Sequence, residues 1–175
     1  FARDHRWKTP DSALLVVGNP PWVTAAELGR LDSSNGPARR NFRNLQGLDA
    51  RTGRSNFDLA EAIWLKLGRE LRDQSPTIAL LCKLSVARNV LERADREEWP
   101  MIAGSFHRID ARRWFGASVE SGLFRLKLGP GPTRREIEYF PSLDAPTPSA
   151  RLGIVDGQVV ADLDRFHAHS RFFGA

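Results

Sequence analysis

Apolar and polar residues divide the chain into segments of strand and helix length. Continuous apolar runs at residues 12–17 and 77–84 predict two strands that are buried on both faces of a parallel sheet. Apolar and charged side chains alternate over most of residues 123–128, which predicts a strand with one charged face. Shorter strands are expected at residues 105–109, 137–140, 154–155 and 158–163, the last two joined by a hairpin turn at Asp156-Gly157.

Two helices are predicted between these strands. Ser55 or Asn56 is expected to cap a helix that runs to about Arg72. A second helix is expected at residues 87–98, where Pro100 stops it. Residues 24–53, ahead of the first helix, carry few large apolar side chains and predict a long functional loop with a short helix at its start. The first helix has an apolar stripe that repeats every four residues, at Leu59, Ile63, Leu67 and Leu71.

The order strand, helix, strand, helix, strand, strand predicts an α/β fold. We expect a partial Rossmann-like sheet that is parallel first and antiparallel at its end. One domain is expected over residues 1–140, and a linker with the start of a further region over residues 141–175, because Pro146 and Pro148 interrupt the chain there. Ligands of such sheets sit beyond the carboxyl ends of the strands. Residues 18–22 and 83–85 lie at that edge.

Composition and charge limit the partners, the compartment and the metal sites that can be expected. The net charge of +5 suits a polyanionic partner such as nucleic acid. Cys82 is the only cysteine, which excludes an internal disulfide and favours a reducing cytoplasm. No apolar run reaches the roughly 20 residues that span a bilayer, so no membrane partner is expected. The spacing of histidines and cysteine predicts no metal site, and His167 and His169 are expected to be solvated loop residues.

The residues Asn19-Pro20-Pro21-Trp22 follow the first predicted strand. The two prolines fix the backbone, and this rigidity aims the Asn19 carboxamide and the Pro20 carbonyl at one point. Both groups can present oxygen acceptors, and Trp22 adds a flat face on which a base can stack for about 1–3 kcal/mol. Together they predict a socket for a planar aromatic amine. A stiff strand ending is the alternative interpretation.

An aromatic amine needs such a socket to react as a nucleophile. Its lone pair is delocalised into the ring, and two acceptors on its hydrogens raise the electron density on nitrogen. This stabilisation helps catalysis only where it is stronger in the transition state. A sulfonium methyl group held in line could then be attacked directly, without a covalent enzyme intermediate. A base inside a duplex would first have to be flipped out.

The stretch from Leu14 to Trp22 resembles the catalytic motif of amino-methyltransferases that use S-adenosylmethionine. Residues 55–64 and 78–83 are similar to the helix and strand that come after that motif in adenine-specific DNA methyltransferases of bacterial restriction–modification systems. Residues 152–161 resemble the opening of their target-recognition region. The chain is therefore identified as the C-terminal half of such a catalytic domain, over residues 1–140, with the start of a recognition region after it.

This resemblance implies the roles of the site residues. Asn19 and the carbonyl of Pro20 would bind the amino group of the target adenine, and Trp22 would stack on the base. Pro21 completes the catalytic motif. The implied reaction is methyl transfer from S-adenosylmethionine to the exocyclic amine of adenine in DNA.

The family binds this cofactor through a Gly-rich turn after an earlier strand. Only 18 residues precede Asn19, and they hold no such turn. Gly129 and Gly131 alternate with prolines and open no helix, so they do not qualify. Since the chain begins with Phe1, we expect a fragment that is inactive alone. Its cofactor-binding half would lie upstream in the same protein or in a partner chain.

Basic residues gather in the loop after the motif. Six arginines lie between residues 30 and 54, against Asp32 and Asp49. They could grip DNA phosphates or line a solvated loop. Lys83 could face the site or the solvent. The predicted DNA contacts are Arg39, Arg40, Arg43, Arg51, Arg54 and Lys83.

Other conspicuous side chains are assigned structural roles. Asp58 is expected to be a charge in the first turn of the first helix. Cys82 is expected in the core. The remaining tryptophans are expected to pack in the core or at its rim: Trp7, Trp64, Trp99 and Trp114.

Two other classes of function fit the same residues. RNA bases and protein glutamine amides also present planar amines, although the basic loop and the tail after Leu128 favour DNA. The chain could also be a non-catalytic DNA-binding module that kept the fold and lost the cofactor site. Restored transfer with the upstream half would exclude that last possibility.

Overall fold

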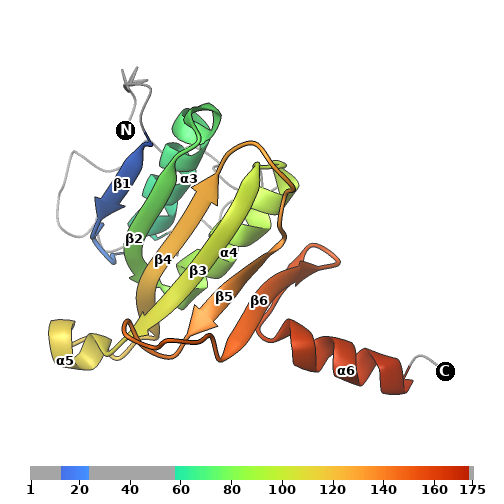
Figure 1. Cartoon of the computed structure of the whole chain (residues 1–175). Coiled ribbons are helices and arrows are strands. Elements are labelled where there is room, and N and C mark those ends of the chain that lie inside the picture. The colour runs from blue at the N-terminus through green and yellow to red at the C-terminus, as the bar shows by residue number, and fades with distance from the viewer. Residues whose placement is uncertain (1–12, 24–57, 174–175) are drawn as a thin grey trace, which may run out of the picture.

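The computed structural model describes residues 13–23 and 58–173 (Figure 1). These residues form one mixed sheet of seven strands in the order β1-β2-β4-β3-β5-β6-β7. This arrangement confirms the predicted α/β fold with parallel and antiparallel parts. The strands are β1 (Leu15–Gly18), β2 (Thr77–Lys83), β3 (Met101–Ile109), β4 (Ser121–Leu128), β5 (Glu136–Phe140), β6 (Ala150–Val155) and β7 (Gln158–Val160).

Five strands point toward the same side of the sheet, because β7 is antiparallel to β6, which is antiparallel to β5. β1 runs parallel to β2, and β3 runs parallel to β5. β4 lies antiparallel between β2 and β3, so β2 and β3 point the same way. We call this side of the sheet the carboxyl edge and define it by Gly18, Lys83 and Ile109.

Two helices of 13 residues each, α3 (Leu59–Leu71) and α4 (Leu84–Arg96), cover one face of the sheet (Figure 1). Their apolar sides bury the alternate strand positions beneath them. Trp64 of α3 packs on Phe124 of β4, with ring centroids 4.6 Å apart. Trp64 and Cys82 are buried, as expected. The remaining helices are η1 (Arg72–Gln74), α5 (Ala111–Phe115) and α6 (Leu163–Phe173).

The prediction that the first strand is buried on both faces is wrong. Leu15 and Val17 of β1 are 62% and 68% exposed. β1 is the end strand of the sheet, and its side chains alternate, so that Val16 and Gly18 face the helices while Leu15 and Val17 face away. A run of apolar residues cannot distinguish an end strand from a central one.

The tail of the chain continues the same sheet. β6 and β7 form a hairpin whose turn residues Asp156 and Gly157 have φ angles of 50° and 77°, as the sequence predicted. β6 also pairs with β5, with Glu138 opposite Arg151. The predicted division between residues 140 and 141 therefore falls between two paired strands, and the assignment of separate domains stays a prediction. None of the described helices is both long and apolar enough to cross a membrane.

Gly68 permits close packing between α3 and the segment after α4. A Cβ atom at Gly68 would lie 2.0 Å from the Trp99 ring, which is 1% exposed and cannot easily move. Gly→Ala in a helix normally stabilises by about 1 kcal/mol. Here we expect Gly68→Ala to destabilise the fold by about 1–3 kcal/mol instead, as overpacking does. Urea unfolding measures the change. In a Trp99→Leu background, Gly68→Ala should lower the free energy of unfolding much less than it does in the wild type. A stabilised Gly68→Ala variant would contradict this packing.

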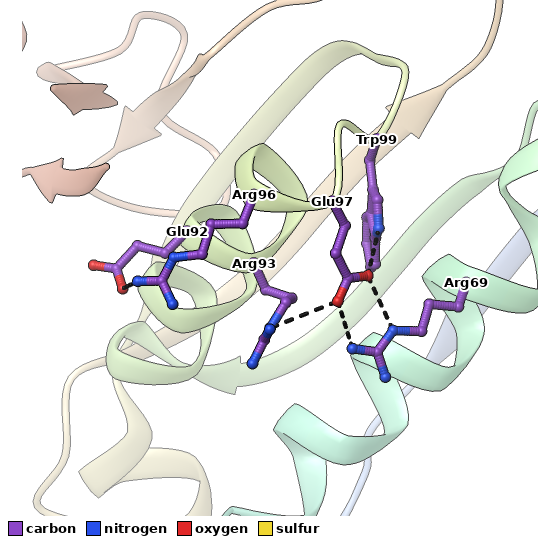
Figure 2. Close-up of polar contacts among 6 residues, drawn as sticks. All are labelled: Arg69, Glu92, Arg93, Arg96, Glu97 and Trp99. Carbon is purple, nitrogen blue, oxygen red and sulfur yellow. Dashed lines mark hydrogen bonds and ion pairs between the residues drawn. The ribbon is translucent and has the colours of Figure 1, made fainter. Parts of the chain in front are cut away.

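A polar network ties α3 to the end of α4, on the far side of the sheet from the carboxyl edge. Figure 2 shows Arg69 reaching the Glu97 carboxylate, with Nε 3.0 Å from Oε2 and Nη2 2.6 Å from Oε1. The indole N–H of Trp99 donates to the same carboxylate at 3.1 Å. Arg93 approaches it at 3.7 Å. The hydrogen bonds from Arg69 lower the pKa of Glu97 below its ordinary value, despite partial burial, which opposes them.

This network predicts a pH-dependent stability. The folded-state pKa of Glu97 is lower than the unfolded one, so its contribution is complete above the unfolded pKa and is lost as pH falls through the folded pKa. We expect Glu97→Gln to cost about 1 kcal/mol at pH 7, because the pair is partly exposed. That corresponds to roughly 2–4 °C in Tm. The difference between wild type and variant should shrink at acid pH. A difference that is constant from pH 7 down to pH 3 would contradict the assignment.

Candidate functional site

The motif of four residues lies directly after β1, at the carboxyl edge. Gly18, the last residue of β1, pairs with Leu80 in the middle of β2. Asn19 and Pro21 are exposed, Pro20 is buried and Trp22 is half-buried. The buried proline anchors this segment, while Asn19 is exposed, so that a ligand can reach it.

Trp22 is held in one orientation. Its indole N–H donates to the backbone carbonyl of Leu81 in β2 at 3.2 Å. Its ring also meets Phe115 of α5 edge-on, with centroids 5.2 Å apart and planes at 62°. These two contacts fix the ring between β2 and α5. An aromatic surface fixed in this way is suited to stack on a planar ligand.

Asp58 connects the end of the motif to the start of α3. The backbone N–H of Leu59 donates to the Val23 carbonyl at 3.0 Å. Asp58 is 7% exposed, and its Oδ1 accepts the backbone N–H of Ala60 at 2.9 Å. It is therefore the N-cap of α3 rather than the first-turn charge that the sequence suggested. The expected caps, Ser55 and Asn56, lie outside the described residues.

Lys83 forms an ion pair with Asp58. It is the last residue of β2 and lies just before α4, and its Nζ contacts Asp58 Oδ2 at 2.9 Å. The charge of Lys83 is thus compensated by Asp58, and its role as a DNA contact stays a prediction. The arginines predicted to contact DNA lie outside the described residues: Arg39, Arg40, Arg43, Arg51 and Arg54.

A second polar pair lies farther along the carboxyl edge. The Tyr139 hydroxyl donates to Glu120 Oε1 at 2.8 Å, and burial together with this hydrogen bond raises the pKa of Tyr139 to about 12. The backbone N–H of Leu84 donates to the Glu120 carbonyl at 2.9 Å. A hollow of about 480 Å³ beside this pair is lined by Lys83, Arg88 and Glu120, among others. It is not lined by any motif residue, so it is distinct from the surface that Asn19 and Trp22 present.

Helix α5 also belongs to the carboxyl edge, and the sequence pattern did not predict it. Asp110 caps this helix by accepting the backbone N–H of Arg113 at 3.0 Å, and Gly116 ends it with a φ of 66°. These two residues were the available signals, because an acidic cap and a final glycine typically bound a helix. The expectation that Trp114 packs in the core or at its rim is wrong, since its side chain is 67% exposed.

The described residues do not supply a cradle for S-adenosylmethionine. β1 is followed by the proline-rich motif, and β2 passes into α4 directly at Lys83 and Leu84. Neither strand end is followed by a Gly-rich turn that opens a helix, which is the arrangement this cofactor needs. In the described part of the chain, no group of three or more His, Cys, Asp or Glu residues could hold a metal ion.

Known proteins share sequence and structure with this chain. No protein-family model matches the chain. The chain is 38% identical over 115 residues, 66% of its length, to the Type II methyltransferase M.NspV of Nostoc sp.. The structure of the Type IIL restriction-modification enzyme MmeI in complex with DNA aligns with 81% of the chain at 16% identity and a TM-score of 0.43. The chain spans 24% of the length of the Nostoc relative and 18% of the MmeI chain.

The similarity to M.NspV confirms the resemblance that the sequence motifs implied. It extends over far more of the chain than the four motif residues, since 115 residues align. The chain is therefore similar in sequence to part of a Type II methyltransferase.

Proposed function

We propose that the chain carries the target-base half of an enzyme that methylates the exocyclic amine of adenine in DNA. The observation that carries this proposal is the arrangement of Asn19 and Trp22. The Asn19 carboxamide is exposed at the carboxyl edge, beside a tryptophan ring that is fixed by Leu81 and Phe115. The sequence similarity to the Nostoc protein, which is named a Type II methyltransferase, supports this proposal.

In this proposal each motif residue acts on the target base. The side-chain oxygen of Asn19 and the carbonyl of Pro20 accept the two hydrogens of the amine. They thereby raise the electron density on nitrogen as it attacks, and this hydrogen bonding strengthens as positive charge develops there. Trp22 stacks on the ring and holds its plane. Pro21 keeps the turn rigid, so that the acceptors are in place before the base arrives.

The methyl donor in this proposal is S-adenosylmethionine, bound outside these 175 residues. The ends of β1 and β2 do not fit that cofactor, and the Nostoc relative is longer than the chain, which matches only 24% of it. The chain alone would then hold the target base but transfer no methyl group. DNA is favoured over RNA or a protein amide by the net charge of +5 and by the arginines after the motif. The expected location is the cytoplasm.

Calorimetry tests whether the cofactor site lies outside this chain, as proposed. We expect no saturable binding when S-adenosylmethionine is titrated into the purified 175-residue chain. The same titration on a longer polypeptide that includes the upstream region should give one-to-one binding. Saturable binding to the short chain would overturn the proposal that the cofactor site lies elsewhere. Labelled methyl transfer to DNA by the short chain would then have to be measured directly.

A further inference from the structure

Exposed apolar and basic side chains gather on α5 and the residues that flank it, 108–119, at the carboxyl edge. Of the seven large apolar side chains exposed in the described part of the chain, three lie here: Trp114, Phe115 and Val119. Large exposed apolar side chains gathered in one short segment mark an interaction site more often than a random surface. Figure 1 shows α5 projecting from the sheet beyond the end of β1.

The same segment is basic. Arg108, Arg112 and Arg113 are exposed, and none of them forms an ion pair with another described residue. The guanidinium of Arg113 lies 5.3 Å from the centroid of the Trp114 ring. Asp110 caps α5 and Glu120 accepts the Tyr139 hydroxyl, and both carboxylates keep their charge, so residues 108–120 hold three arginines against two carboxylates. The segment therefore presents a small excess of positive charge next to an exposed aromatic ring.

We propose that α5 is a DNA-binding surface that contacts the strand beside the target nucleotide. Arg112 and Arg113 would contact phosphates, and Trp114 would stack on a base next to the one in the socket. This combination of basic and aromatic side chains is what single-stranded or locally opened nucleic acid requires. The inference rests on the proposed function, because it places α5 relative to the target base.

The position of α5 links this surface to the socket. Phe115, which follows Trp114, touches Trp22 edge-on with centroids 5.2 Å apart. Trp114 is thus one residue from a direct contact with the motif. A base held by Asn19 and Trp22 would have its neighbouring nucleotides within the span of this short helix. A flipped base leaves its neighbours partly unstacked, and an exposed indole can stack on one of them.

Fluorescence anisotropy with the 175-residue chain tests this surface. The probe is a fluorescein-labelled duplex with one adenine opposite an abasic site. We expect Arg112→Ala/Arg113→Ala to weaken binding about tenfold at low salt. The slope of log K against log salt should fall by about 1.8, since each lost phosphate contact removes about 0.9. Trp114→Ala should weaken binding at least about fivefold, and Trp114→Phe should restore most of it.

The matched control is Arg72→Ala/Arg165→Ala, which removes the same charge from η1 and α6. This control should leave the salt slope nearly unchanged. Equal losses in the two double variants would overturn the assignment of α5 while leaving DNA as the partner. Failure of the wild-type chain to bind the duplex would overturn both this inference and the DNA part of the proposed function. Circular dichroism and thermal melting verify that each variant is folded.

Discussion

Asn19→Ala is expected to abolish methyl transfer by the enzyme assembled from this chain and its cofactor-binding half. We expect kcat to fall by at least about 10²–10³-fold, which is the effect of removing one transition-state hydrogen-bond partner from an enzyme site. Because Asn19 is exposed, the free energy of unfolding should change by less than about 0.5 kcal/mol. Single-turnover transfer of a labelled methyl group and urea unfolding measure the two quantities.

Two further variants separate the acceptor role of Asn19 from a general effect. Asn19→Asp keeps an oxygen acceptor at the same place and should retain more transfer than Asn19→Ala. Gln158→Ala removes an exposed carboxamide at the β6–β7 turn and should leave transfer unchanged. Full turnover by Asn19→Ala would show that the carboxamide does not hold the amine.

Asp58→Ala is expected to have the largest effect on stability among the variants considered. The change removes the N-cap of α3 and leaves Lys83 without its partner in a half-buried position. We expect a loss of about 2–4 kcal/mol, since a lost cap costs about 1 kcal/mol and breaking a buried ion pair costs more. Thermal melting should show a decrease of roughly 5–10 °C in Tm.

Asp58→Ser distinguishes the cap from the ion pair. A serine side chain can still accept the backbone N–H of Ala60, but it carries no charge for Lys83. Asp58→Ser should be less stable than the wild type and more stable than Asp58→Ala. Adding Lys83→Met should recover part of the loss in Asp58→Ala, because the unpaired charge is then gone. Strictly additive losses would show that the two side chains are not coupled.

The sequence predicted most of the sheet because its strands have clear periodicity. β2 was expected to end at residue 84 and ends at Lys83, and the β6–β7 hairpin follows from Asp156-Gly157. The exposure of β1 could not be predicted, because the position of a strand in a sheet depends on pairings distant in sequence. The start of α4 at Leu84 also depends on tertiary contact: the Leu84 N–H bonds to the Glu120 carbonyl, 36 residues later.

The candidate site was predicted in part. Local sequence was enough to find Asn19 to Trp22, because two adjacent prolines after an apolar run are rare and stiff. The contacts that position Trp22 come from Leu81 and Phe115, which lie 59 and 93 residues away in sequence. The Asp58–Lys83 pair joins side chains 25 residues apart. No local pattern indicates such partners, so only the folded chain reveals how the motif is supported.

The most direct test of the central claim is the identity of the methylated product. The chain, together with the proposed upstream half, is incubated with labelled S-adenosylmethionine and with DNA, RNA or a glutamine-containing protein in separate reactions. Digestion to nucleosides or amino acids and mass spectrometry then locate the label. We predict N6-methyladenine in DNA, lost in Asn19→Ala. Label in RNA, in glutamine or at a ring carbon of cytosine would contradict the proposed target of the Asn19–Trp22 site.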